Sequence, residues 1–77
     1  MESVYVLVKA APGRIEETVK AIALRPCVVE ASAVTGAYDI IVKVQAASVT
    51  EALAQVVREV RPVPGVLSTE TLVTVRT

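Results

Sequence analysis

The 77-residue sequence has no histidine, tryptophan, phenylalanine or asparagine, and it has a single cysteine, Cys27. Histidine is the commonest general base, and a catalytic Cys27 would be expected to have one as its partner. One cysteine and no histidine also cannot supply the four ligands of a structural zinc site within one chain. No CxxC motif and no glycine-rich phosphate loop is present. We therefore expect a protein that is not an enzyme and that needs no metal and no cofactor.

An excess of one charge and a long apolar run are also missing. Eight Lys and Arg balance eight Asp and Glu without a basic block, so no nucleic-acid partner is expected. No run of 18 apolar residues predicts a membrane span. The N-terminal stretch MESVYVLVK lacks the basic leader and apolar segment of an export signal. A lone cysteine favours a reducing, cytoplasmic location, and the absence of thermolabile asparagine is typical of a thermophile.

The apolar periodicity predicts six elements in one domain that spans residues 1–77. Runs rich in β-branched residues predict strands at 3–10, 27–34, 38–46 and 66–76. A helical period predicts one helix over 13–25 and a second between a capping box at Ser48 and Pro62. The order β-α-β-β-α-β predicts an α+β, ferredoxin-like fold, a four-stranded antiparallel sheet with both helices on one face.

Alternation along the strands divides their side chains between two faces of the sheet. The face expected under the helices is apolar throughout: Val4, Val6, Val8, Ala31, Ala33, Ile40, Val42, Val44, Val73 and Val75. The opposite face has an apolar centre, Tyr5, Leu7, Val34, Ile41 and Leu72, with charged or polar ends that include Lys9, Glu30, Asp39, Lys43 and Arg76. A sheet face in water is mostly polar, whereas an apolar centre with a polar rim is typical of an interface. We therefore expect a homodimer that forms face to face through the sheets.

The stretch TGAYDI, residues 35–40, joins the second and third predicted strands and has the features of a ligand site. Gly36 leaves backbone N–H groups open, and Asp39 supplies an acceptor for an ammonium group. Ser68, Thr69 and Thr71 add hydroxyls after the break at Pro64-Gly65. Backbone N–H groups and hydroxyls can hold a carboxylate while Asp39 holds an amine, which suits a free α-amino acid. In the simpler interpretation, the hydroxyls only decorate a strand and Asp39 caps the turn.

The stretches VVEASAVTGAYDIIVKV and VPGVLSTETLVTV resemble the effector-binding domain of the Lrp/AsnC transcription regulators, and the resemblance covers essentially all 77 residues. It implies a βαββαβ domain that pairs through its sheets, assembles into tetramers to octamers and binds amino acids at clefts between dimers. It implies that Gly36, Ala37, Tyr38 and Asp39 line such a cleft. It further implies that Thr69 and Thr71 face the same cleft, with Ser68 alongside.

Full-length members of that family carry an N-terminal winged helix-turn-helix, whereas this sequence begins with Met1 at the first predicted strand. The resemblance implies a stand-alone effector domain that modulates full-length Lrp/AsnC regulators without binding DNA itself. Where several members have an acidic residue near the second helix, this sequence reads Ala46-Ala47-Ser48. That departure leaves open an interaction module that has lost its ligand. A small dimeric ferredoxin-like enzyme that uses Tyr38 and Asp39 is a third alternative.

Overall fold

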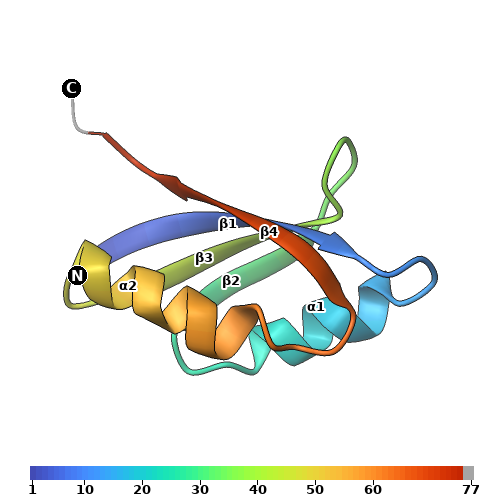
Figure 1. Cartoon of the computed structure of the whole chain (residues 1–77), viewed down its shortest axis with the longest axis horizontal. Coiled ribbons are helices and arrows are strands. Elements are labelled where there is room, and N and C mark those ends of the chain that lie inside the picture. Colours follow the sequence, from blue (N-terminus) through green and yellow to red (C-terminus); the bar gives the residue numbers. More distant parts are fainter. Residues whose placement is uncertain (76–77) are drawn as a thin grey trace.

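The βαββαβ order predicted from the sequence is confirmed by a computed structural model of the chain, which describes residues 1–75 (Figure 1). The elements are β1 (Glu2–Ala10), α1 (Ile15–Ala23), β2 (Val28–Ala33), β3 (Ile40–Ala46), α2 (Val49–Gln55), a π-helical turn η1 (Val56–Val60) that continues α2, and β4 (Val66–Val73). Both helices lie on the same face of the antiparallel sheet, as a ferredoxin-like fold requires. Arg76, expected on the other face, lies outside the described residues. Among residues 1–75, no helix is long and apolar enough to cross a membrane.

The strands lie in the order β2-β3-β1-β4, so β1 separates β3 from β4. Val8 shows what this order does, because it pairs with Ile40 of β3 on one side and with Thr69 of β4 on the other. The turn that precedes β3 and the first half of β4 therefore lie at the same end of the sheet, on either side of β1.

The core consists mainly of alternate residues from the two central strands. The helix-facing side chains of β1 and β3 are fully buried, and these are Val4, Val6, Val8, Ile40, Val42 and Val44. Ile22 of α1 and Val60 of η1 are fully buried against them. Burying one such aliphatic side chain stabilises a fold by roughly 1.5–3 kcal/mol. The predicted helix-facing side of these two strands is confirmed.

The prediction that the helices cover the helix-facing residues of β4 is wrong. This edge strand is not covered by a helix. Its register pairs Val73 with Val4, so Val73 does point toward the helix side, yet it is 46% exposed, and Val75 is 83% exposed. The helices pack mainly on β1, β2 and β3. Thr69 and Thr71 also lie on this uncovered helix side of β4, since they pair with Val8 and Val6.

The second helix begins as predicted and ends differently. The Ser48 side-chain oxygen accepts a hydrogen bond from the Glu51 N–H at 3.1 Å, which caps the first turn of α2. At the other end the chain widens into η1, where the Arg61 N–H donates to the Val56 carbonyl, five residues earlier, at 3.0 Å. Val57, in this widened turn, is 53% exposed.

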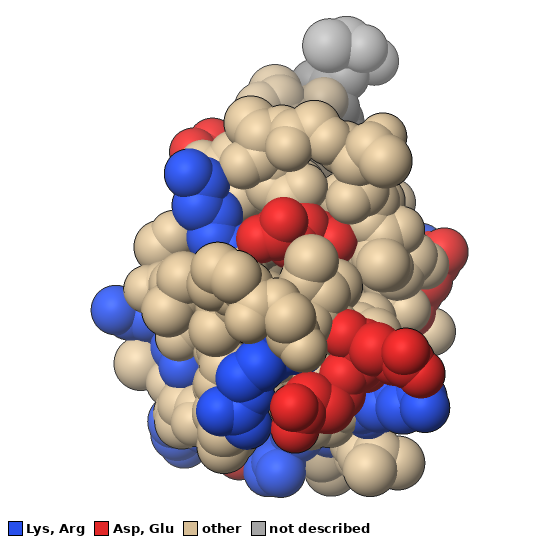
Figure 2. Space-filling model, turned by 90° about the vertical axis from the view of Figure 1, so that its right-hand side faces the viewer, with Lys and Arg blue, Asp and Glu red and all other residues tan. Residues whose placement is uncertain are grey.

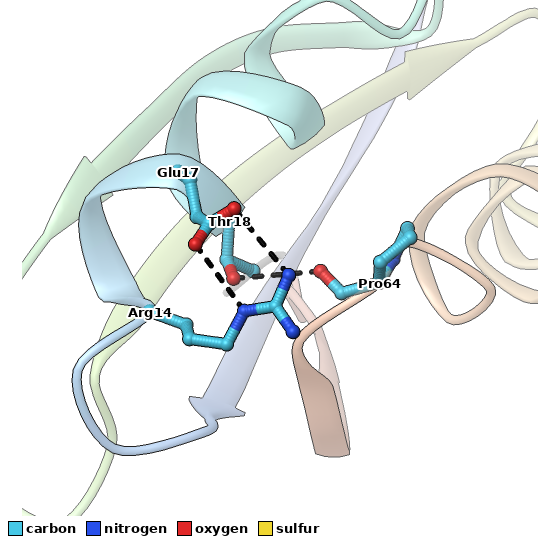
Figure 3. Close-up of polar contacts among 4 residues, drawn as sticks. All are labelled: Arg14, Glu17, Thr18 and Pro64. Carbon is cyan, nitrogen blue, oxygen red and sulfur yellow. Dashed lines mark hydrogen bonds and ion pairs between the residues drawn. The ribbon is translucent and has the colours of Figure 1, made fainter.

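A close contact attaches α1 to the segment that leads into β4. Thr18 is fully buried, and its hydroxyl donates to the Pro64 carbonyl at 3.4 Å, beside the exposed Arg14–Glu17 ion pair (Figure 3). Gly65, the next residue, has a φ of +97°, and a Cβ added to it would lie 2.2 Å from the Thr18 hydroxyl oxygen. Both the backbone conformation and the space available therefore require glycine at position 65.

Candidate functional site

The turn between β2 and β3 is exposed and carries unused backbone donors. Gly36 has a φ of +117°, and nothing lies within 4 Å of the place where a Cβ would stand. The turn closes through the Val34 N–H, which donates to the Asp39 carbonyl at 2.8 Å. Within residues 1–75, the N–H groups of Gly36, Ala37 and Tyr38 make no hydrogen bond. These donors are available to an external acceptor.

Asp39 uses one of its two carboxylate oxygens inside the fold. Its Oδ2 accepts from the Ala10 N–H at 2.8 Å, at the point where the β1–β4 register shifts between Lys9 and Ala10. The carboxylate thus stabilises an irregular strand end, rather than only its own turn. Its Oδ1 has no hydrogen-bond partner in the described part of the chain. Oδ1 is therefore available to accept a hydrogen bond from an ammonium group, as expected for Asp39.

Tyr38 connects the turn to β4 across β1. Its hydroxyl donates to Glu70 Oε1 at 2.7 Å, and the Lys9 ammonium lies 6.0 Å from the centre of its ring. Because β1 separates β3 from β4, a contact between the ends of these two strands requires a long side chain. A tyrosine is long enough to span the gap, and only the strand order shows this. Figure 2 views this end of the molecule, where acidic and basic side chains are interspersed.

The Tyr38–Glu70 bond makes a testable prediction about titration. The hydrogen bond to Glu70, with smaller contributions from desolvation and from the Glu70 charge, raises the pKa of Tyr38 above its usual 10.0. The contact is therefore present at neutral pH and lost as the pH rises through the raised pKa. In a Tyr5→Phe background Tyr38 is the only tyrosine. There we expect Glu70→Gln to lower the pKa of Tyr38, measured by tyrosinate absorbance. Glu30→Gln is the control, and equal titrations of the Glu70→Gln variant and its parent would contradict the bond.

Thr69 and Thr71 face a groove of about 550 Å³ between β4 and the α2–η1 helix. Ser68 also lines this groove, although it pairs with Lys9 and its side chain therefore belongs to the other face of the sheet. This volume is within the range of roughly 300–1,000 Å³ that is typical of small-molecule sites. The groove is lined by Leu53, Val56, Val57, Arg61, Val66, Leu67, Ser68, Thr69 and Thr71. Within residues 1–75, the hydroxyls of Ser68, Thr69 and Thr71 make no hydrogen bond. Arg61 was not expected here, since the sequence shows only that it ends a helix.

The predicted site residues therefore form two clusters, which we call the turn cluster (Gly36, Ala37, Tyr38 and Asp39) and the groove. Neighbouring strands lie about 4.8 Å apart, so β3 and β4 are separated by about 10 Å across β1. Thr69 and Thr71 face the helix side of the sheet, whereas Tyr38 reaches Glu70 across the face that points away from the helices. One carbon atom joins the amine and carboxylate of an α-amino acid, so one molecule does not reach both clusters of the same chain.

The sheet face away from the helices has the apolar centre that alternation predicted. Tyr5, Leu7 and Ile41 are half-buried there, and Leu72 is 43% exposed at the β4 edge. Lys43 lies beside this centre, with its ammonium 6.0 Å from the middle of the Tyr5 ring. No helix of the described chain covers this face (Figure 1). We call it the open sheet face.

Comparison with protein families and solved structures gives concordant results. The model of the Lrp/AsnC ligand binding domain matches residues 3–77. TTHA0845 from Thermus thermophilus is 34% identical, with a TM-score of 0.89 over 100% of this chain and 96% of that one. The hypothetical protein PHS023 from Pyrococcus horikoshii is 27% identical, with a TM-score of 0.86 over 100% and 93% of the two chains.

A larger protein shares the fold. The transcriptional regulator NMB0573 from Neisseria meningitidis, solved as a complex with L-Met, is 15% identical, with a TM-score of 0.78 over 97% of this chain and 50% of that one. At this identity the likeness concerns the fold alone. No curated protein sequence gives a significant match.

Proposed function

The chain belongs to the Lrp/AsnC ligand-binding domain family, and on this premise we propose that residues 1–77 form one regulatory domain that binds a free amino acid and catalyses no reaction. The observation that carries the proposal is the turn cluster, in which unused N–H groups lie beside the free Asp39 oxygen. The unbonded hydroxyls of β4 lie at the same end of the sheet. The similarly folded Neisseria regulator was solved with L-Met, so an amino acid is the first ligand class to test.

The proposed site is completed by a second copy of the chain. Two copies pair through their open sheet faces, where apolar centres meet and charged rims surround them. These homodimers assemble further, into tetramers to octamers, and the turn cluster of one copy meets the β4 hydroxyls of another at the cleft between dimers. The separation of the two clusters by β1 within one chain supports this arrangement. Ligand binding then favours one assembly state by its differential affinity.

The proposed partners are full-length Lrp/AsnC regulators, which would share the same assembly interface. The domain leaves DNA contacts to such a partner, because its formal net charge is zero and its charges are interspersed (Figure 2). We place it in the cytoplasm, where free amino acids are present and the single thiol of Cys27 stays reduced.

A thermal-shift screen of the twenty amino acids tests the ligand class. We expect at least one of them to raise the melting temperature at millimolar concentration. Asp39→Asn should abolish the shift, because it removes the charge that meets the ammonium group yet keeps a side-chain oxygen for the Ala10 N–H.

Glu51→Gln, which removes an exposed carboxylate at the start of α2, is the matched control and should respond like the parent. If no amino acid shifts the melting temperature of the parent, the domain is an interaction module without a ligand of this class.

A further inference from the structure

We propose that the groove between α2–η1 and β4 binds aliphatic monocarboxylates through Arg61, so that its ligand needs no amine. The class includes simple branched-chain acids. The inference shares Ser68, Thr69 and Thr71 with the amino-acid site proposed above and rests on that function only to this extent. The Arg61 side of the groove belongs to one chain and is formed without a second copy.

Arg61 supplies a positive charge that the fold leaves without a counter-ion. Within residues 1–75 it forms no ion pair, whereas Arg14 pairs with Glu17 and Arg25 pairs with Glu59. A guanidinium group stays charged at all accessible pH values and offers paired donors that match the two oxygens of a carboxylate. An unpaired guanidinium on the wall of a groove is therefore suited to a carboxylate ligand.

The backbone defines where the Arg61 side chain starts. Its N–H is bonded to the Val56 carbonyl at 3.0 Å, and its dihedral angles are helical, with φ −59° and ψ −35°. Pro62 follows, and a proline disfavours the helical region in the residue before it, so the bond to Val56 holds Arg61 against a local preference. The turn is also π-helical, and single π turns within helices occur frequently at functional sites.

The remaining walls of the groove are suited to an alkyl chain and contain no carboxylate that could bind an amine. Leu53, Val57 and Leu67 line it and are 37%, 53% and 64% exposed. They offer apolar surface to a ligand on the side of the sheet that carries the free hydroxyls. No aspartate or glutamate of the described chain lines the groove. Asp39 belongs to the turn cluster, and Glu70 pairs with Leu7 on the other face of the sheet, so an ammonium group finds no carboxylate in the groove.

The test uses 4-methylpentanoate and its neutral isostere 4-methylpentanamide as probes, in isothermal titration calorimetry of the full chain. We expect the acid to bind at least 10-fold more tightly than the amide, because only the acid forms charge-assisted hydrogen bonds. Arg61→Gln should weaken binding of the acid by roughly 10- to 100-fold, as expected for the loss of such bonds.

Arg58→Gln is the matched control. It removes the same charge three residues earlier, from a side chain that lines a different hollow, and should bind the acid like the parent. Amide chemical shifts of the parent provide a readout that needs no variant: the acid should perturb residues 67–71 more than residues 35–39. Equal binding of acid and amide, no binding at 10 mM acid, or unchanged binding by a folded Arg61→Gln variant would overturn the inference.

The same experiment separates this inference from the proposed amino-acid function through Asp39→Asn. Binding of 4-methylpentanoate should not change in that variant, because Asp39 does not line the groove. If the acid binds in an Arg61-dependent way while no amino acid shifts the melting temperature, the groove inference stands and the amino-acid function fails. If amino acids bind through Asp39 and the acid does not bind, the groove inference alone fails.

Discussion

Replacing Gly65 by alanine is expected to lower the free energy of unfolding by roughly 2–6 kcal/mol. The φ of +97° costs a residue with a Cβ about 1–3 kcal/mol. The new methyl group also lies 2.2 Å from the buried Thr18 hydroxyl oxygen, and overpacking of this kind costs about 1–3 kcal/mol more. The sum is a large share of the roughly 5–15 kcal/mol that stabilises a typical domain. Chemical denaturation monitored by circular dichroism measures it.

Gly13→Ala provides the matched control for the steric part of this effect. Gly13 also has a positive φ, +78°, but nothing lies within 4 Å of its added Cβ, so only the backbone cost applies. Thr18→Ala should recover part of the loss in the Gly65→Ala background, because it removes the atom that clashes. Equal destabilisation by the Gly13 and Gly65 substitutions would show that α1 and the β4 approach do not pack as described.

The second large effect concerns the proposed pairing through the open sheet face. The parent should sediment at micromolar concentration as a species of at least twice the 8.1 kDa chain mass, and Ile41→Asp should reduce it to a monomer. Ile41 lies opposite Leu7 at the centre of that face, so each interface would bury two aspartates, one from each copy. An unpaired buried charge costs about 3–5 kcal/mol, which corresponds to a rise in the dissociation constant of more than 100-fold.

Leu24→Asp is the control for nonspecific effects of a new charge. Leu24 follows α1 on the helix layer and is already 84% exposed, so the same substitution there should leave the mass unchanged. If the parent sediments as an 8.1 kDa species, the proposed interface does not form, and the proposed cleft between dimers does not form either.

Part of the candidate site can be predicted from residue patterns in the sequence. The stretch from Gly36 to Asp39 and the hydroxyls of β4 are visible in the sequence as turn residues and polar strand positions. Their separation into two clusters is not visible, because it depends on β1 lying between β3 and β4. Arg61, Glu70 and Lys9 carry no local signal that connects them with either cluster. Their contacts join residues tens of positions apart, such as Tyr38 and Glu70.

The sequence by itself determined the βαββαβ order, the cap at Ser48 and the buried faces of β1 and β3. These features follow from apolar periods of about two and 3.6 residues and from side-chain bonds to nearby backbone, all of which act within a few residues. Only the tertiary structure decided that β4 stays uncovered on its helix side, that Arg61 lines a groove there, and that Thr18 leaves room only for glycine at position 65. The physical reason is that these features depend on which distant segments pack together, and neither propensity nor periodicity encodes that choice.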